Sequence, residues 1–139
     1  MDIDYRSAKE YLAHEHYYGR QVRALFLTGA LIMLITLPLF ASLVPVSESV
    51  SLGAIILVGF FAGLTNPLAR SVAVINSGIA ALAGIAFEYG AVGAYLNANE
   101  PLEWWFFAVN QVLAVIFFFA LYFGSKTLRG IFFKDKSVR

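Results

Sequence analysis

The chain has 139 residues, of which 60% are hydrophobic, 16% are aromatic and only 14% are charged. This composition is far more apolar than that of a soluble domain, and it predicts an integral membrane protein with a single domain. The net charge of +1 gives no electrostatic basis for nucleic-acid binding. The absence of cysteine excludes disulfides, thiolate metal sites and cysteine nucleophiles.

Residues 1–21 precede the first apolar run, and we expect an amphipathic cytoplasmic or interfacial helix there. Ser7 and Glu10 have the spacing of a capping box, and an apolar stripe continues from this segment into the membrane. His14-Glu15-His16 suggests a metal site, but side chains two residues apart on a helix point about 200° apart. We therefore expect a solvated helix face and no metal at this position.

Four apolar stretches are predicted to cross the bilayer, because about 20 apolar residues span about 30 Å of hydrocarbon. They cover residues 22–44, 50–65, 71–96 and 104–124, and the second is the shortest. A basic cytoplasmic tail follows at residues 125–139. The expected fold is an all-α integral membrane protein, a four-transmembrane-helix bundle.

The basic residues indicate the orientation of these stretches. Every Lys and Arg lies before the first stretch or at its first residues, between the second and third, or after the fourth. The other two connections carry no basic residue and three acidic ones, Glu48, Glu100 and Glu103. The positive-inside rule then places both termini in the cytoplasm, with the chain in a plasma (inner) membrane. Because all copies insert in one orientation, we expect any homo-oligomer to be parallel.

The third stretch combines small residues with one carboxyl group, Glu88. A helical wheel places several Ala and Gly residues on the same face as Glu88. Small residues allow helices to approach closely in a membrane. The predicted helix-packing residues are Ala80, Ala81 and Gly84 on the third stretch and the GxxxG pair Gly59 and Gly63 on the second.

Glu88 lies eight residues, about 12 Å, from the outer end of its stretch. Thr36 on the first stretch and Asn110 and Gln111 on the fourth are expected at a similar depth. Because no Lys or Arg lies at this level, we expect Glu88 to be protonated unless a cation or water reaches it. Proton uptake and cation binding would then compete, and these four residues form a predicted ion or proton pathway.

A structural role for Glu88 is the alternative. Its carboxyl group would then make interhelical hydrogen bonds to Asn110 or Gln111 and hold helices or subunits together. Lys126, Arg129, Lys134 and Lys136 in the tail are expected to contact anionic lipid headgroups. The sequence shows no nucleophile with a base, no paired carboxylates within a span and no phosphate-binding loop, so we expect neither an enzyme nor a cofactor.

Two functions fit these features. With four spans and no detectable internal repeat, one chain is small for a complete pore or alternating-access transporter. We therefore expect a small homo-oligomeric channel or transporter for a cation or proton that uses Glu88. The alternative is a non-transporting membrane scaffold or an accessory (assembly) subunit whose intramembrane polar residues are structural. The expected partners are the lipid bilayer, further copies of the chain and a cation or proton.

Overall fold

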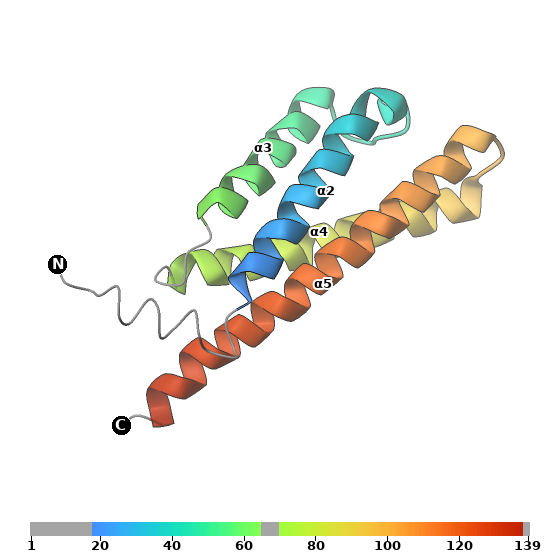
Figure 1. Cartoon of the computed structure of the whole chain (residues 1–139). Coiled ribbons are helices and arrows are strands. Elements are labelled where there is room, and N and C mark those ends of the chain that lie inside the picture. The colour runs from blue at the N-terminus through green and yellow to red at the C-terminus, as the bar shows by residue number, and fades with distance from the viewer. Residues whose placement is uncertain (1–17, 65–69, 138–139) are drawn as a thin grey trace.

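The computed structural model describes residues 18–64 and 70–137, and this part of the chain is helical (Figure 1). Its helices are α2 (Gly19–Phe40), α3 (Glu48–Leu64), α4 (Arg70–Asn97) and α5 (Pro101–Ser137). The all-α prediction is confirmed for the described residues. The expected helix over residues 1–21 falls almost entirely outside them, and residues 19–21 form the first turn of α2.

Three of these helices are long and apolar enough to cross a membrane, over Gly19–Phe40, Ser71–Asn97 and Pro101–Gly130. The protein is therefore a helical membrane protein in contact with lipid. The fourth, α3, is apolar but has 17 residues, which extend over about 25 Å. The structure thus provides three membrane-length helices where the sequence predicts four spans, and a fourth crossing by α3 stays a prediction.

The helix ends differ from the predicted span ends at α2 and α5. The first stretch is predicted to reach residue 44, but α2 ends at Phe40. The N–H groups of Leu43 and Val44 both donate hydrogen bonds to the Phe40 carbonyl oxygen in the turn that follows. Pro45 disfavours the helical conformation for the residue before it. In contrast, α5 continues to Ser137, thirteen residues past the predicted end at residue 124, and the tail contains no proline that would end the helix.

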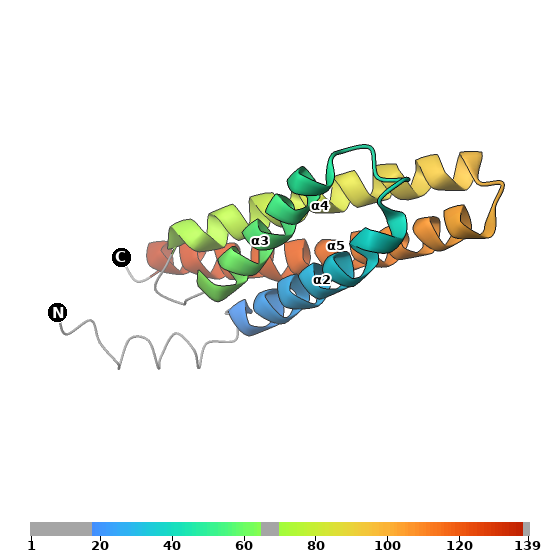
Figure 2. The ribbon, with the colours of Figure 1, turned by 90° about the horizontal axis from the view of Figure 1, so that it is seen from above.

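The helices form two hairpins, α2 with α3 and α4 with α5 (Figures 1 and 2). The connections at residues 41–47 and 98–100 point toward the same end of the molecule, which we call the loop end. The contact between α4 and α5 is the most extensive, and α2 packs on both α3 and α5. In contrast, α3 and α4 touch little. The α2–α3 hairpin thus lies on one side of the α4–α5 pair.

The core is centred on Phe117 of α5, whose side chain is fully buried. Its ring centroid lies 5.8 Å from that of Phe26 on α2 and 5.7 Å from that of Phe87 on α4. Gly29 of α2 faces the same ring, and a Cβ atom there would lie 3.0 Å from Cζ of Phe117. Three helices therefore meet around one aromatic side chain.

The buried side of α5 repeats at helical spacing: Asn110, Leu113, Phe117, Ala120, Gly124 and Thr127. The spacing of three or four residues places all six side chains on one helical face. Gly124 receives Ser77 of α4, because a Cβ atom on this glycine would lie 2.6 Å from Ser77 Oγ. The packing of this face fixes the rotation of α5 about its axis.

Arg23 joins the two helices of the first hairpin. Its Nε donates a hydrogen bond of 3.1 Å to the carbonyl oxygen of Ala62, in the last turn of α3. The last four carbonyl groups of a helix lack intrahelical partners, and a cation near them also interacts favourably with the helix dipole. Arg23 is thus a C-terminal cap for α3 as well as one of the basic residues that orient the chain.

Replacing Arg23 with Gln is expected to lower the free energy of unfolding by about 1 kcal/mol, because the charged donor to Ala62 is lost. Arg20→Gln is the matched control: this arginine lies on the same helix, is exposed and carries the same charge. Denaturant titration of both variants in detergent measures the difference. Equal stability of the two variants would show that the Arg23 contact contributes nothing.

Candidate functional site

Glu88 and Gln111 form a hydrogen-bonded pair between α4 and α5. The Nε2 of Gln111 donates to Oε2 of Glu88 over 3.0 Å, and Glu88 is exposed at the surface of the chain. Glu88 is the acidic residue of the third apolar stretch, so its carboxyl group lies on a helix of membrane length. The structure therefore exposes a carboxyl group, held by one neutral donor, on a surface that otherwise suits lipid.

The pair lies in a groove of about 640 Å³ between α4 and α5. We call it the Glu88 groove; its lining includes Ala81, Gly84, Glu88, Gln111, Ala114 and Phe118. All of its lining residues come from α4 and α5, and the α2–α3 hairpin contributes none. Its lining is mostly apolar, and small side chains line part of its α4 wall. Small side chains on a membrane helix allow another helix to come close.

Thr36 and Asn110 do not share this groove. The Thr36 hydroxyl donates to the Ile32 carbonyl over 2.7 Å, and Asn110 Nδ2 donates to the Phe106 carbonyl over 2.8 Å. Asn110 belongs to the buried side of α5, and Gln111 is rotated from it by about 100°. The structure therefore brings together only Glu88 and Gln111 of the four predicted pathway residues.

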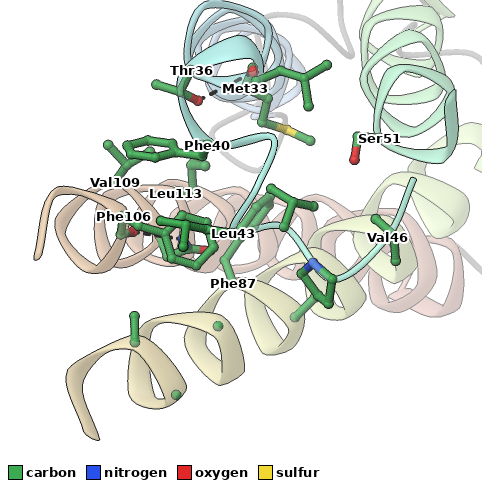
Figure 3. A pocket seen from close by; sticks show the side chains of 18 of the residues that line it. Met33, Thr36, Phe40, Leu43, Val46, Ser51, Phe87, Phe106, Val109 and Leu113 are labelled. Atoms are coloured by element: carbon green, nitrogen blue, oxygen red, sulfur yellow. Dashed lines mark hydrogen bonds between the residues drawn. The ribbon is translucent and has the colours of Figure 1, made fainter. Parts of the chain in front are cut away.

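Thr36 and Asn110 line a second cavity of about 600 Å³ instead. It lies toward the loop end, where the α2–α3 connection passes over α4 and α5, and we call it the loop-end cavity (Figure 3). Its lining includes Phe40, Leu43, Ile55, Phe87, Glu103 and Phe106. On α4, its lining residues lie about 100° or more around the helix from Glu88. The two cavities share one lining residue, Tyr89, and neither Glu88 nor Gln111 lines the loop-end cavity.

Glu103 supplies a carboxylate to the loop-end cavity, and its position follows from the start of α5. Pro101 is the first residue of the helix and Glu103 the third, which is the capping-box position for an acidic side chain. Its Oε2 accepts the backbone N–H groups of Asn99 and Glu100. From the sequence we predict Glu103 only as a marker of orientation, although its spacing from Pro101 is also that of a capping residue.

The predicted helix-packing residues have different positions. Ala80 is buried against α5, Ala81 lines the Glu88 groove, and a Cβ atom on Gly84 would lie 4.0 Å from the Phe118 backbone nitrogen. The GxxxG pair behaves differently: Cβ atoms on Gly59 and Gly63 would meet nothing within 4 Å in the described structure. The buried residues of α3 are Ile55, Val58 and Ala62, so the GxxxG pair is not used for packing between the described helices.

Among the predicted headgroup residues, Lys126 is half-buried and lies over two tyrosine rings. Its Nζ is 4.7 Å from the ring centroid of Tyr122 and 5.4 Å from that of Tyr18. Arg129 is exposed. The helix α5 continues past Lys134 and Lys136, whose side chains lie outside the described part. Headgroup binding by these four residues stays a prediction.

Within residues 18–64 and 70–137, no group of three or more His, Asp or Glu side chains is placed to hold a metal ion. The His14-Glu15-His16 motif lies outside these residues. Comparison with protein families, with curated proteins and with solved structures finds no match to this chain.

Proposed function

We propose that this protein is a small membrane channel or transporter for a cation or proton, assembled from parallel copies in a plasma (inner) membrane with both termini in the cytoplasm. Glu88 is the binding or protonation site. The observation that supports the proposal is the exposed Glu88–Gln111 pair on membrane-length helices. A carboxyl group in hydrocarbon is costly, and such groups characteristically belong to ion pathways or proton relays.

A second copy of the chain would remove this cost by covering the Glu88 groove. Gln111 engages only Oε2 of Glu88, so the other oxygen can meet a cation, a proton or a neighbouring subunit. Small side chains beside the pair, Ala81, Gly84 and Ala114, allow another helix to come close. A copy in the same orientation meets the groove at the same depth, because the strong charge asymmetry favours a single insertion direction.

The roles within the pathway follow from the geometry. Glu88 provides the only charge of the Glu88 groove, and Gln111 holds its carboxylate by donating an amide hydrogen, while the Gln111 amide oxygen is a neutral ligand for a cation. Thr36 and Asn110 use their donors on their own helices and line the other cavity. The proposed pathway therefore depends on Glu88 and Gln111, whereas Thr36 and Asn110 contribute only if the path crosses between the helices.

A non-transporting scaffold or accessory subunit is the second candidate. It is favoured by the hydrogen bond between Glu88 and Gln111, because two polar side chains that satisfy each other also hold two helices together without any ion. In this case the exposed side of the pair binds a neighbouring subunit or a partner helix, and no flux occurs.

The Glu88→Gln variant separates the two functions, since glutamine keeps hydrogen bonding but cannot ionise. In proteoliposomes, the pathway function requires that flux of protons or monovalent cations fall severalfold or lose its pH dependence, while the oligomer seen by native mass spectrometry persists. Glu48→Gln removes an exposed carboxylate at the start of α3 and serves as the control.

Unchanged flux in Glu88→Gln would contradict the pathway. The scaffold function predicts a different pattern, in which Glu88→Gln assembles normally and Glu88→Leu, which loses both hydrogen bonding and charge, dissociates the oligomer. Size-exclusion chromatography of the two variants in the same detergent distinguishes these outcomes.

A further inference from the structure

The loop-end cavity has the size and lining of a small-molecule site. Its volume of about 600 Å³ lies within the range of ligand pockets, which are mostly apolar with a few placed polar groups. Figure 3 shows Phe40, Phe106 and Leu113 together on one side of the cavity, with Val46 and Ser51 across from them. The ring centroids of Phe40 and Phe106 are 5.3 Å apart. The side chains come from α2, α4, α5 and the α2–α3 connection, so a bound molecule would contact both hairpins.

The way into this cavity follows from the helix packing. α3 and α4 make little contact with each other, yet both contribute lining residues, including Val50 and Ala54 on α3 and Tyr89 and Gly93 on α4. Val50 and Tyr89 are exposed by 58% and 83%, respectively. A lipophilic molecule can therefore enter from the side, between the apolar helix α3 and the membrane-length helix α4, without first passing through water.

The charges at the loop end select the class of ligand. Glu103 is the only charged residue in the lining of the cavity. Glu48 begins α3 and Glu100 belongs to the α4–α5 connection, both at the same end, and the chain has no Lys or Arg in residues 24–69 or 71–125. An anionic ligand would thus find no counter-charge here, whereas a cationic one meets a negative potential at the mouth of an apolar cavity.

The geometry of Glu103 suits contact with a ligand cation. Both backbone donors, from Asn99 and Glu100, bind the same oxygen, Oε2. Neither of these bonds uses Oε1, and the described residues provide no other partner for this carboxylate. The side chain is therefore held in place by α5 while one of its oxygens stays available. Aromatic rings in the cavity wall add favourable surfaces for a cation.

From these observations we propose that the loop-end cavity binds an amphipathic organic cation, with the apolar body among Phe40, Phe87 and Phe106 and the positive charge at Glu103. This site includes neither Glu88 nor Gln111, and the proposal stands whether or not Glu88 carries ions. A lipid acyl chain would contact the apolar walls but would not need the carboxylate. Binding of the organic cation should therefore depend on the charge of Glu103, whereas binding of an acyl chain should not.

The test uses the full-length protein in an uncharged detergent, with tetraphenylphosphonium as the probe. Tetraphenylborate has the same shape and the opposite charge. Isothermal titration calorimetry, with protein-free micelle titrations subtracted, is expected to show saturable binding of the cation. Glu103→Gln should weaken this binding about tenfold, and Glu100→Gln, which removes the same charge from a residue that does not line the cavity, should change it less than twofold.

A second variant tests the location without changing any charge. Ala86 lines the cavity and is exposed, so Ala86→Phe fills the space without displacing core residues and should also weaken binding of the cation severalfold. Equal binding to wild type and Glu103→Gln, or equally tight saturable binding of tetraphenylborate, would overturn the proposal and indicate a site for neutral lipid chains. An unchanged affinity in Ala86→Phe would likewise overturn it, because the cation would then bind elsewhere.

Discussion

Phe117→Ala is expected to lower the free energy of unfolding by about 3 kcal/mol, the largest effect of any variant considered for this chain. The ring of Phe117 is fully buried and packs against Phe26 of α2 and Phe87 of α4. Its removal leaves a cavity where three helices meet, and the dispersion contacts of the surrounding rings are lost. Packing of this kind is the main force that holds helices together in a membrane.

Phe119→Ala is the control for this variant, because Phe119 lies two residues further along α5 and is 48% exposed. Much of its ring lies outside the core, so its truncation should lower the free energy of unfolding by well under about 1 kcal/mol. Reversible denaturant unfolding in mixed micelles, followed by tryptophan fluorescence, measures both variants. Similar losses for the two would show that the contact of α2 with α4 and α5 does not depend on Phe117.

Gly124→Ala is expected to destabilise the α4–α5 contact by about 2 kcal/mol. The new Cβ atom would lie 2.6 Å from Ser77 Oγ, far inside van der Waals contact, and both residues are buried. The helices must then separate slightly or the serine must leave its rotamer. Gly78→Ala on α4 is the control, because a Cβ atom there meets nothing within 4 Å, and alanine is the better helix former.

The double variant Ser77→Ala with Gly124→Ala should recover most of this loss. The Ser77 Cβ atom lies 3.6 Å from the position of the new Cβ, which is an ordinary contact, so removing Oγ removes the clash. Ser77→Ala alone should be nearly neutral, since the hydroxyl is buried without a hydrogen-bond partner among the described residues. Additive effects in this double-mutant cycle would contradict a direct contact between the two residues.

Much of the helical framework could be predicted from the sequence. The predicted stretches 50–65 and 71–96 lie within two residues of the ends of α3 and α4. The prediction was less accurate at α2 and α5, because apolar composition marks the hydrocarbon layer, whereas a helix ends where backbone hydrogen bonding stops. Residue 44 is still apolar although the α2 backbone has already turned at Phe40, and the basic tail of α5 stays helical.

The candidate site could be predicted only in part. The depth of Glu88 along its helix indicated a partner on the fourth stretch, but Asn110 and Gln111 are adjacent and differ by about 100° in direction. The choice between them depends on the rotation of α5, which is set by Phe117 and Gly124 on its buried side. A helical wheel contains no information about that rotation until the neighbouring helices are known.

The sequence by itself determined that this is a helical membrane protein with its basic residues segregated from its acidic connections, because hydropathy and charge act residue by residue along the chain. Only the tertiary structure decided that Glu88 faces outward with Gln111 while Thr36 and Asn110 face a separate cavity beside Glu103. The physical reason is that helix rotation and pairing follow from the fit of side chains far apart in sequence, such as Ser77 against Gly124 and Phe26 against Phe117.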